Sequence, residues 1–136
     1  MGIFKKKKDD MAAFLYAQQG ELDAVLMYEK LAAAVTDDRD RKTFERLAKD
    51  EQRHADVFFA FTKDESLKPK KTKAIAVPFM YKVLGKKAVY PLIALGEYQA
   101  VWKYRPVAKK YDEVKTVKSD ERHHGNAVLA LLREEK

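Results

Sequence analysis

The sequence predicts an all-α protein, an antiparallel four-helix bundle built from two similar helix pairs joined by a long crossover. Three observations lead to this fold class. The chain has 136 residues, 46% of them hydrophobic and 36% charged, with only five Gly and four Pro, which suits one helical domain. Apolar residues recur at steps of three and four along four segments, and turn-forming residues separate these segments.

The first helix is expected from Asp9 to about Val35, preceded by a basic and flexible N-terminus over residues 1–8. Thr36, Asp37 and Asp38 supply the turn and the N-cap of a second helix that runs to about Thr62. The core-facing positions are Phe14, Gln18, Glu21, Val25, Tyr28, Ala32 and Val35 in the first helix, and Phe44, Leu47, Glu51, His54, Phe58 and Phe61 in the second.

A crossover over residues 63–89 is expected between the two helix pairs. Its first part, 63–73, contains Pro69 and five Lys and is predicted to be a loop. Residues 74–87 are apolar and predict a short helix that begins near Pro78.

The second helix pair follows the crossover and, with residues 9–62, completes one domain over 9–136. Pro91 is expected to open its first helix or to lie early in it, and Pro106 to end or kink that helix near Arg105. Asp112 is the expected N-cap of the last helix. The core-facing positions of the first helix of this pair are Tyr90, Ile93, Glu97, Ala100 and Tyr104. Those of the last helix are Val114, Val117, Glu121, His124, Val128 and Leu131.

Composition excludes several classes of function. The sequence has no Cys, which rules out disulfides, iron–sulfur clusters, thiolate zinc sites and a thiol nucleophile. No run of 18 apolar residues predicts a transmembrane segment, and no apolar stretch follows the N-terminal lysines as in a secretory signal. A cytoplasmic location is therefore expected. The net charge of +7 comes partly from clusters at 5–8 and 68–73; solvated segments are favoured over a nucleic-acid or anionic surface partner.

Ionisable residues interrupt each apolar stripe near its middle. "DEQRH" places Glu51 and His54 three residues apart, and "DERHH" repeats this spacing with Glu121 and His124. The other two helices carry one Glu each, in "GELDAVLMY" and "GEYQAVWKY", which match at Gly, Glu, Ala, Val and Tyr. The two halves therefore read as a duplicated two-helix unit.

The spacing predicts that these groups meet at one depth. Glu21 and Glu51 lie 16 and 14 residues from the turn at Asp37, so at about 1.5 Å per residue they reach similar heights in an antiparallel pair. In the second pair, Glu97 lies eight residues before Arg105 and Glu121 nine after Asp112.

Four carboxylates in one apolar layer would repel each other and lose hydration, and two divalent cations would relieve both penalties. Oxygen ligands with one imidazole per metal suit iron or manganese, and zinc also fits. The predicted roles are bridging carboxylates for Glu51 and Glu121, terminal carboxylates for Glu21 and Glu97, and terminal imidazoles for His54 and His124. Tyr28 and Tyr104 are candidate hydrogen-bond donors to carboxylates on the opposite helix. His123 is expected at the surface and Trp102 in the packing.

With these motifs the sequence resembles the ferritin-like superfamily, and within it the rubrerythrin group. "GELDAVLMY" and "DEQRHADVFF" are similar to the first two helices of that group. The middle segment, "SLKPKKTKAIAVPFMYKVLG" followed by "GEYQA", is more similar to ferritin-like domains joined to vacuolar-iron-transporter-type membrane proteins. Two features depart from the rubrerythrin pattern: Ala100 stands where an additional Glu is found, and a C-terminal rubredoxin domain with four Cys is missing.

The resemblance implies a di-iron oxidoreductase that reacts with peroxide or O2, of the peroxidase or ferroxidase type, with electrons supplied by an external donor protein. It also implies a homodimer. Two alternatives remain open: an iron buffer, sensor or delivery protein without turnover, and a basic protein that associates with nucleic acid to protect it.

Overall fold

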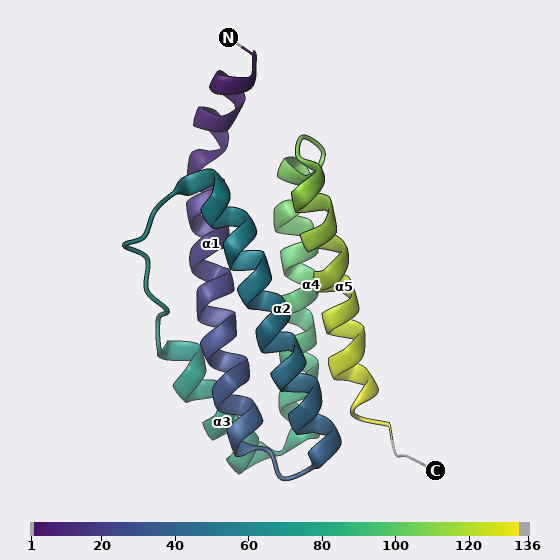
Figure 1. The fold of residues 1–136 in the computed structure, drawn as a ribbon. Helices are drawn as coiled ribbons and strands as arrows, with labels where there is room; N and C mark the ends of the chain where they lie inside the picture. The colour runs from purple at the N-terminus through teal and green to yellow at the C-terminus, as the bar shows by residue number, and fades with distance from the viewer. Residues whose placement is uncertain (1, 134–136) are drawn as a thin grey trace.

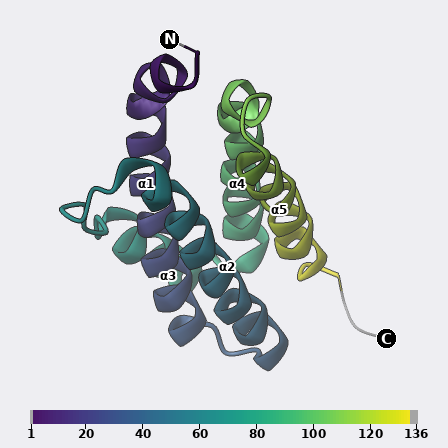
Figure 2. The ribbon, with the colours of Figure 1, turned by 45° about the horizontal axis from the view of Figure 1, so that its top comes forward.

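The computed structural model describes residues 2–133, and in this part of the chain it contains five helices and no strand. The helices are α1 (Gly2–Ala34), α2 (Asp38–Thr62), α3 (Thr72–Leu84), α4 (Lys86–Ala108) and α5 (Asp112–Ala130). Figures 1 and 2 show α1 beside α2 and α4 beside α5, with α3 lying along α1 and the first turns of α1 projecting beyond the other helices. The protein is a helical bundle.

Most predicted boundaries of the first helix pair agree with the structure. Asp37 caps α2, since its side chain accepts a hydrogen bond from the backbone N–H of Asp40. Lys63, in a left-handed conformation, ends this helix. The predicted start at Asp9 is wrong, because α1 already begins at Gly2; lysine is a good helix former and nothing between 2 and 9 interrupts the backbone ladder.

The helix boundaries predicted from the prolines agree with the structure only approximately. Pro78 lies inside α3, which begins at Thr72 and ends at Leu84 rather than spanning 74–87. Pro91 sits early in α4, as one of the two expected placements had it, but Pro106 does not end α4 at Arg105, because the helix continues to Ala108. A proline removes only its own N–H from the ladder, and packing of the neighbouring turns can retain the helix. Gly85, with φ of 83°, separates α3 from α4.

The start of α5 differs by one residue from the prediction. Tyr111 occupies the N-cap position, and Asp112 is the first helical residue. Asp112 and Glu113 lie in the first turn, where their negative charges interact favourably with the positive end of the helix dipole. Asp112 therefore stabilises the start of α5 although it is not the N-cap.

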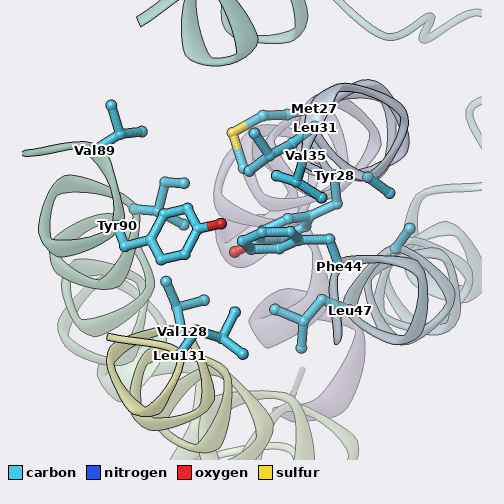
Figure 3. Packing of buried hydrophobic residues seen from close by; sticks show 13 residues of the cluster. Met27, Tyr28, Leu31, Val35, Phe44, Leu47, Val89, Tyr90, Val128 and Leu131 are labelled. Atoms are coloured by element: carbon cyan, nitrogen blue, oxygen red, sulfur yellow. The ribbon is translucent and has the colours of Figure 1, made fainter. Parts of the chain in front are cut away.

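The apolar core consists of two clusters, one on each side of a polar layer. Figure 3 shows the first cluster, in which Tyr28 of α1 stacks on Phe44 of α2, with ring centroids 5.9 Å apart, while Tyr90 meets Phe44 edge-on. The second cluster is formed by Phe14, Ala17, Phe58, Tyr104, Val107, Ala108, Val114 and Val117. Since the clusters hold the bundle on both sides, the layer between them is fixed in position.

Two other side chains complete the description of the bundle. Trp102, expected in the packing, is 68% exposed and carries the Arg105 guanidinium 4.8 Å above its ring, so that prediction is wrong. Asp40 is fully buried at one end of the bundle, where the hydroxyl of Tyr90 donates to it at 2.6 Å and the Lys86 ammonium lies 3.2 Å away.

Candidate metal centre

The polar layer brings together all six residues predicted as metal ligands. Glu21 comes from α1, Glu97 from α4, and one Glu-x-x-His pair from each of α2 and α5. None of the six is more than 6% exposed. An i, i+3 spacing directs both members of each pair to the same face of their helix, and the layer therefore joins all four long helices.

His54 turns its Nδ1 atom towards the carboxylates. This atom lies 2.9 Å from Glu121 Oε1, 3.2 Å from Glu51 Oε1 and 3.5 Å from Glu21 Oε2. His124 repeats this arrangement from the other side of the layer: its Nδ1 lies 3.0 Å from Glu51 Oε1, 3.2 Å from Glu97 Oε2 and 3.5 Å from Glu121 Oε1. The two imidazole rings face each other at 5.6 Å between centroids.

Several of these buried atoms lack a hydrogen-bond partner among the described residues despite the short distances. They are Glu21 Oε2, Glu51 Oε1, His54 Nδ1 and Glu121 Oε1. Buried polar atoms without a partner are costly, and a cation placed between them would satisfy all four. The donor set, four carboxylates and two imidazoles, fits a pair of divalent cations in charge and ligand type.

Two groups of four residues could each hold a metal ion, with the ligand atoms of each group within 4.8 Å of one another. The first group is Glu21, Glu51, His54 and Glu121, and the second is Glu51, Glu97, Glu121 and His124. Glu51 and Glu121 belong to both groups.

Two aspartates that the sequence analysis had not assigned to the site hold the far side of the histidine rings. His54 Nε2 donates to Asp120 Oδ2 at 2.8 Å, and His124 Nε2 donates to Asp50 Oδ2 at 2.9 Å. Each contact crosses between α2 and α5. Since each Nε2 is engaged with an aspartate, Nδ1 is the atom of each ring that could bind a metal once it carries no proton. The signal was present in the repeat, since "DEQRH" and "DERHH" both begin with Asp.

The two tyrosines of the repeat donate to the opposite helix pair. The Tyr28 hydroxyl hydrogen-bonds to Glu97 Oε1 at 2.9 Å, and the Tyr104 hydroxyl to Glu21 Oε1 at 2.7 Å. Burial and the nearby carboxylates raise the pKa of both phenols well above the usual value, so the hydroxyl proton stays in place as a donor.

Three of the four glutamates in the layer have raised pKa values because they are buried close to other carboxylates. Burial, followed by the charges of Glu21 and Glu97, raises the pKa of Glu51 well above its ordinary value. Burial and the charge of Glu121 raise the pKa of Glu97 to about 7. Burial also raises the pKa of Glu21. Without cations, some of these acids therefore retain protons near neutral pH.

Glu121 behaves differently because both imidazoles contact it. Burial alone would raise its pKa, but the contacts with His124 and His54 outweigh burial and lower the pKa to about 2. Conversely, burial alone would lower the pKa of each histidine, but Glu121 and the other carboxylates raise it. The protons held by this layer occupy the positions that cations would take, so metal binding should release them.

His123, beside the ligand His124, is exposed, as predicted. No helix in the described part of the chain is both long and apolar enough to cross a membrane.

A bundle whose buried layer contains four glutamates and two histidines defines a class of metal-binding carboxylate proteins. A family model described as Rubrerythrin matches residues 13–132, nearly the whole chain, and the chain belongs to this family. Membership implies a di-iron carboxylate protein. No curated protein and no solved structure matches the chain.

Proposed function

We propose that the polar layer binds two iron ions, with manganese or zinc as alternative occupants, and that the protein uses them to reduce peroxide or O2. The observation that carries this proposal is the set of unsatisfied carboxylate and imidazole atoms that face one another in the layer. Glu51 and Glu121, shared by both groups, would bridge the metals. Glu21 with His54 and Glu97 with His124 would complete the two sites.

The surrounding residues would hold these ligands in place. Asp50 and Asp120 would keep a proton on each histidine Nε2, so that Nδ1 would serve as the ligand atom. Tyr28 and Tyr104 donate to one oxygen of each terminal carboxylate, which leaves the other oxygen for coordination. Because each of these contacts crosses between the two helix pairs, we infer a duplicated unit whose halves complete one another's ligands.

Iron bound here would supply reversible one-electron redox chemistry and an open position for peroxide or O2. The chain itself would keep the six ligand side chains largely buried between the two apolar clusters and keep both phenols protonated. Reduction of one H2O2 to two waters takes two electrons and two protons, and two Fe(II) ions hold two electrons. Since the chain contains no Cys, further turnover would need an external electron-donor protein.

We also propose that the protein acts in the cytoplasm as a homodimer. Support for the dimer comes from apolar side chains that remain exposed on α3 and α4 outside the groove described below, namely Ile75, Phe79, Val83, Leu84 and Leu95. A second copy that packs on these residues would remove them from water. Light scattering coupled to size exclusion should give twice the mass of the chain.

The test is metal analysis of protein purified without added metal, followed by anaerobic Fe(II) loading and stepwise peroxide addition. We expect two metals per chain, consumption of one H2O2 per pair of metals with a rise in near-ultraviolet absorption, and then a halt until a reductant is supplied. Metal binding without any consumption of peroxide or O2 would instead support an iron buffer, sensor or delivery protein. Sustained peroxide loss without a reductant would contradict the requirement for a donor.

A further inference from the structure

A groove runs between α1 and α4, with α3 as its third wall, and its floor is the carboxylate layer. Its volume is about 480 Å³. A water molecule occupies about 30 Å³ in the liquid, so the groove is much larger than one molecule of O2 or H2O2 would need. Small-molecule sites in proteins commonly enclose about 300–1,000 Å³. The groove is therefore large enough for an organic ligand.

Two glycines border this space. Gly20 and Gly96 both line the groove, each one residue before a glutamate of the layer. A Cβ atom added at either position would meet no atom within 4 Å. By contrast, a Cβ at Gly125 would lie 2.5 Å from the ring of Tyr98, so that glycine serves close packing.

Glycine is a poor residue for a helix interior, and close packing does not explain Gly20 or Gly96. Their effect on the molecule is the empty space next to Glu21 and Glu97. This points to a groove whose width matters for function rather than for stability.

The walls of the groove are apolar. Along its length they consist of small and flexible aliphatic side chains from three helices, Ala24, Met27, Val77, Met80, Leu92 and Ile93. The unbranched side chains of Met27 and Met80 can adapt to the shape of a chain-like ligand. A polar metabolite would gain little from such walls, whereas a hydrocarbon chain would gain the transfer of its surface out of water.

Cationic side chains also line the groove. Lys70, Lys73 and Lys103 line it and are exposed. The side chains of Lys70 and Lys73 have no ion-pair partner among the described residues, and the Lys103 ammonium lies only near the hydroxyl and ring of Tyr16. Outside the buried layer, the one acidic residue in the lining is Asp23.

Asp23 offsets only one of the three lysine charges. Its Oδ1 accepts hydrogen bonds from the backbone N–H of Lys70 at 2.7 Å and from the Gln19 side chain at 2.8 Å. The carboxylate is therefore engaged in holding the loop onto α1. The exposed rim of the groove carries an excess of positive charge that suits an anionic head group.

We propose that this groove binds a fatty-acid anion, with its hydrocarbon chain along the apolar walls and its carboxylate among Lys70, Lys73 and Lys103. This inference goes beyond the proposed redox function and does not require the metal centre to be filled.

The first test measures binding of dodecanoate to the metal-free full chain by titration calorimetry, below the concentration at which dodecanoate forms micelles. Dodecan-1-ol and dodecyltrimethylammonium, with the same chain length, serve as neutral and cationic probes. We expect saturable binding of one dodecanoate per chain, weaker binding of the alcohol and the weakest binding of the cation. Equal binding of all three probes, or no saturable binding of dodecanoate, would overturn the proposal.

The second test separates head group from chain. The triple variant Lys70→Gln, Lys73→Gln and Lys103→Gln should bind dodecanoate about tenfold more weakly, which is the effect of a few exposed charge contacts, and should bind dodecan-1-ol unchanged. The matched control removes three exposed lysines outside the groove, Lys42, Lys87 and Lys109, and should bind dodecanoate like the wild type. An equal loss in both triple variants would mean that net charge alone attracts the anion, and the site assignment would fall.

The third test fills the groove. Gly20→Leu with Gly96→Leu should abolish dodecanoate binding while helicity and metal content are retained and the melting temperature does not fall, because leucine favours helix and is not a ligand. Ala60→Leu on the exposed face of α2 is the control and should bind normally. Unchanged dodecanoate binding in the filled variant would overturn the proposal. So would a wild-type dimer, found by light scattering, that the filling mutations dissociate, because the groove would then hold a second copy of the chain.

Discussion

The two helix pairs carry the same polar residues at the same heights but different packing residues. Seven residues before each shared glutamate stand Phe44 in α2 and Val114 in α5, and seven residues after it stand Phe58 and Val128. In the folded protein one cluster contains Phe44 with Val128 and the other contains Phe58 with Val114. Each apolar cluster therefore combines one large side chain from α2 with one small side chain from α5. The sum of the two side-chain volumes is the same in both clusters although the two helix pairs differ.

This comparison separates two kinds of constraint. The polar layer requires particular atoms at particular positions, so both halves keep the same residues. The apolar layers require only a total volume, so the two halves can distribute it unequally. As a result both tyrosines of the repeat rest on α2, Tyr28 on Phe44 and Tyr104 on Phe58, with ring centroids 5.9 and 5.3 Å apart.

The supports of the two histidines are also unequal. Arg53 donates to Asp50 at 2.7 Å, in addition to the contact from His124. Burial alone would raise the pKa of Asp50, but these two contacts lower it below the usual value. At the position that corresponds to Arg53, the second half has the exposed His123 in place of an arginine.

The largest effect should come from the residues that belong to both metal groups. Glu51→Ala or Glu121→Ala removes a ligand from each group, and we expect at least one of two metals per chain to be lost. Metal analysis after gel filtration measures this. His123→Ala is the control and should retain both metals. A variant that keeps two metals with unchanged affinity would show that the shared glutamates do not bridge.

The next largest effect concerns stability without metal. The combined variant Glu51→Leu with Glu121→Leu removes two of the crowded acids and leaves Glu21 opposite His54 and Glu97 opposite His124. Replacement of buried ionic groups by apolar residues stabilises by about 1–4 kcal/mol where the new side chains fit. We expect the metal-free variant to melt above the metal-free wild type.

Melting with and without Fe(II) or Mn(II) completes this test. The wild type should gain stability with rising metal concentration, because metal binds the folded bundle in preference to the unfolded chain. The double variant should not respond. A less stable variant that still responds to metal would mean that the carboxylates do not share a buried site.

The next effect concerns the two aspartates that contact the histidines, and it compares the metal affinities that the two helix pairs support. Asp120→Ala and Asp50→Ala each release one histidine Nε2, and loss of such a partner typically lowers metal affinity by about 10- to 100-fold. Competition with a chelator of known affinity gives the two values. Asp56→Ala, on the exposed face of α2, should have no effect. If both site variants match the wild type, the aspartates do not position the histidines.

A smaller effect is expected from the tyrosine hydroxyls. Tyr28→Phe and Tyr104→Phe keep the ring packing but leave a buried carboxylate oxygen without its donor, which costs about 1–3 kcal/mol. The cost should be larger at position 28, where the side chain is fully buried, than at position 104, where it is 9% exposed. Urea unfolding of the metal-free variants measures the difference; the reverse order would contradict the burial argument.

The smallest effect is expected where the two halves differ in length. α1 has 33 residues and α4 has 23. Deletion of residues 2–8 leaves Asp10, which holds Lys110 and Tyr111 at 3.1 Å each. We expect unchanged metal content and a change of less than about 0.5 kcal/mol in the free energy of unfolding. A large fall in melting temperature would show that the N-terminal turns pack on the bundle, and Asp10→Ala would then be the milder variant.

The repeated spacing was sufficient to predict the six residues of the layer and the two tyrosines, because helix periodicity converts positions in the chain into positions on one face. Boundaries at proline were less accurate. Pro78 and Pro106 both lie within helices, since one missing backbone N–H does not outweigh the packing of the turns around it. The prediction for Trp102 was wrong because this residue lies next to the core face of its helix and not on it. At such a position the sequence does not distinguish an exposed aromatic residue from a buried one.

The sequence by itself determined the helical class and the meeting of four glutamates and two histidines, because these follow from local periodicity and from a repeat within one chain. Only the tertiary structure decided which partner each side chain takes. The contacts of Asp120 with His54, of Asp50 with His124 and of each tyrosine with the opposite carboxylate join residues 66–83 positions apart. The open groove beside Gly20 and Gly96 likewise depends on the separation of α1 from α4, a distance that the packing of side chains from all five helices sets and that no local pattern encodes.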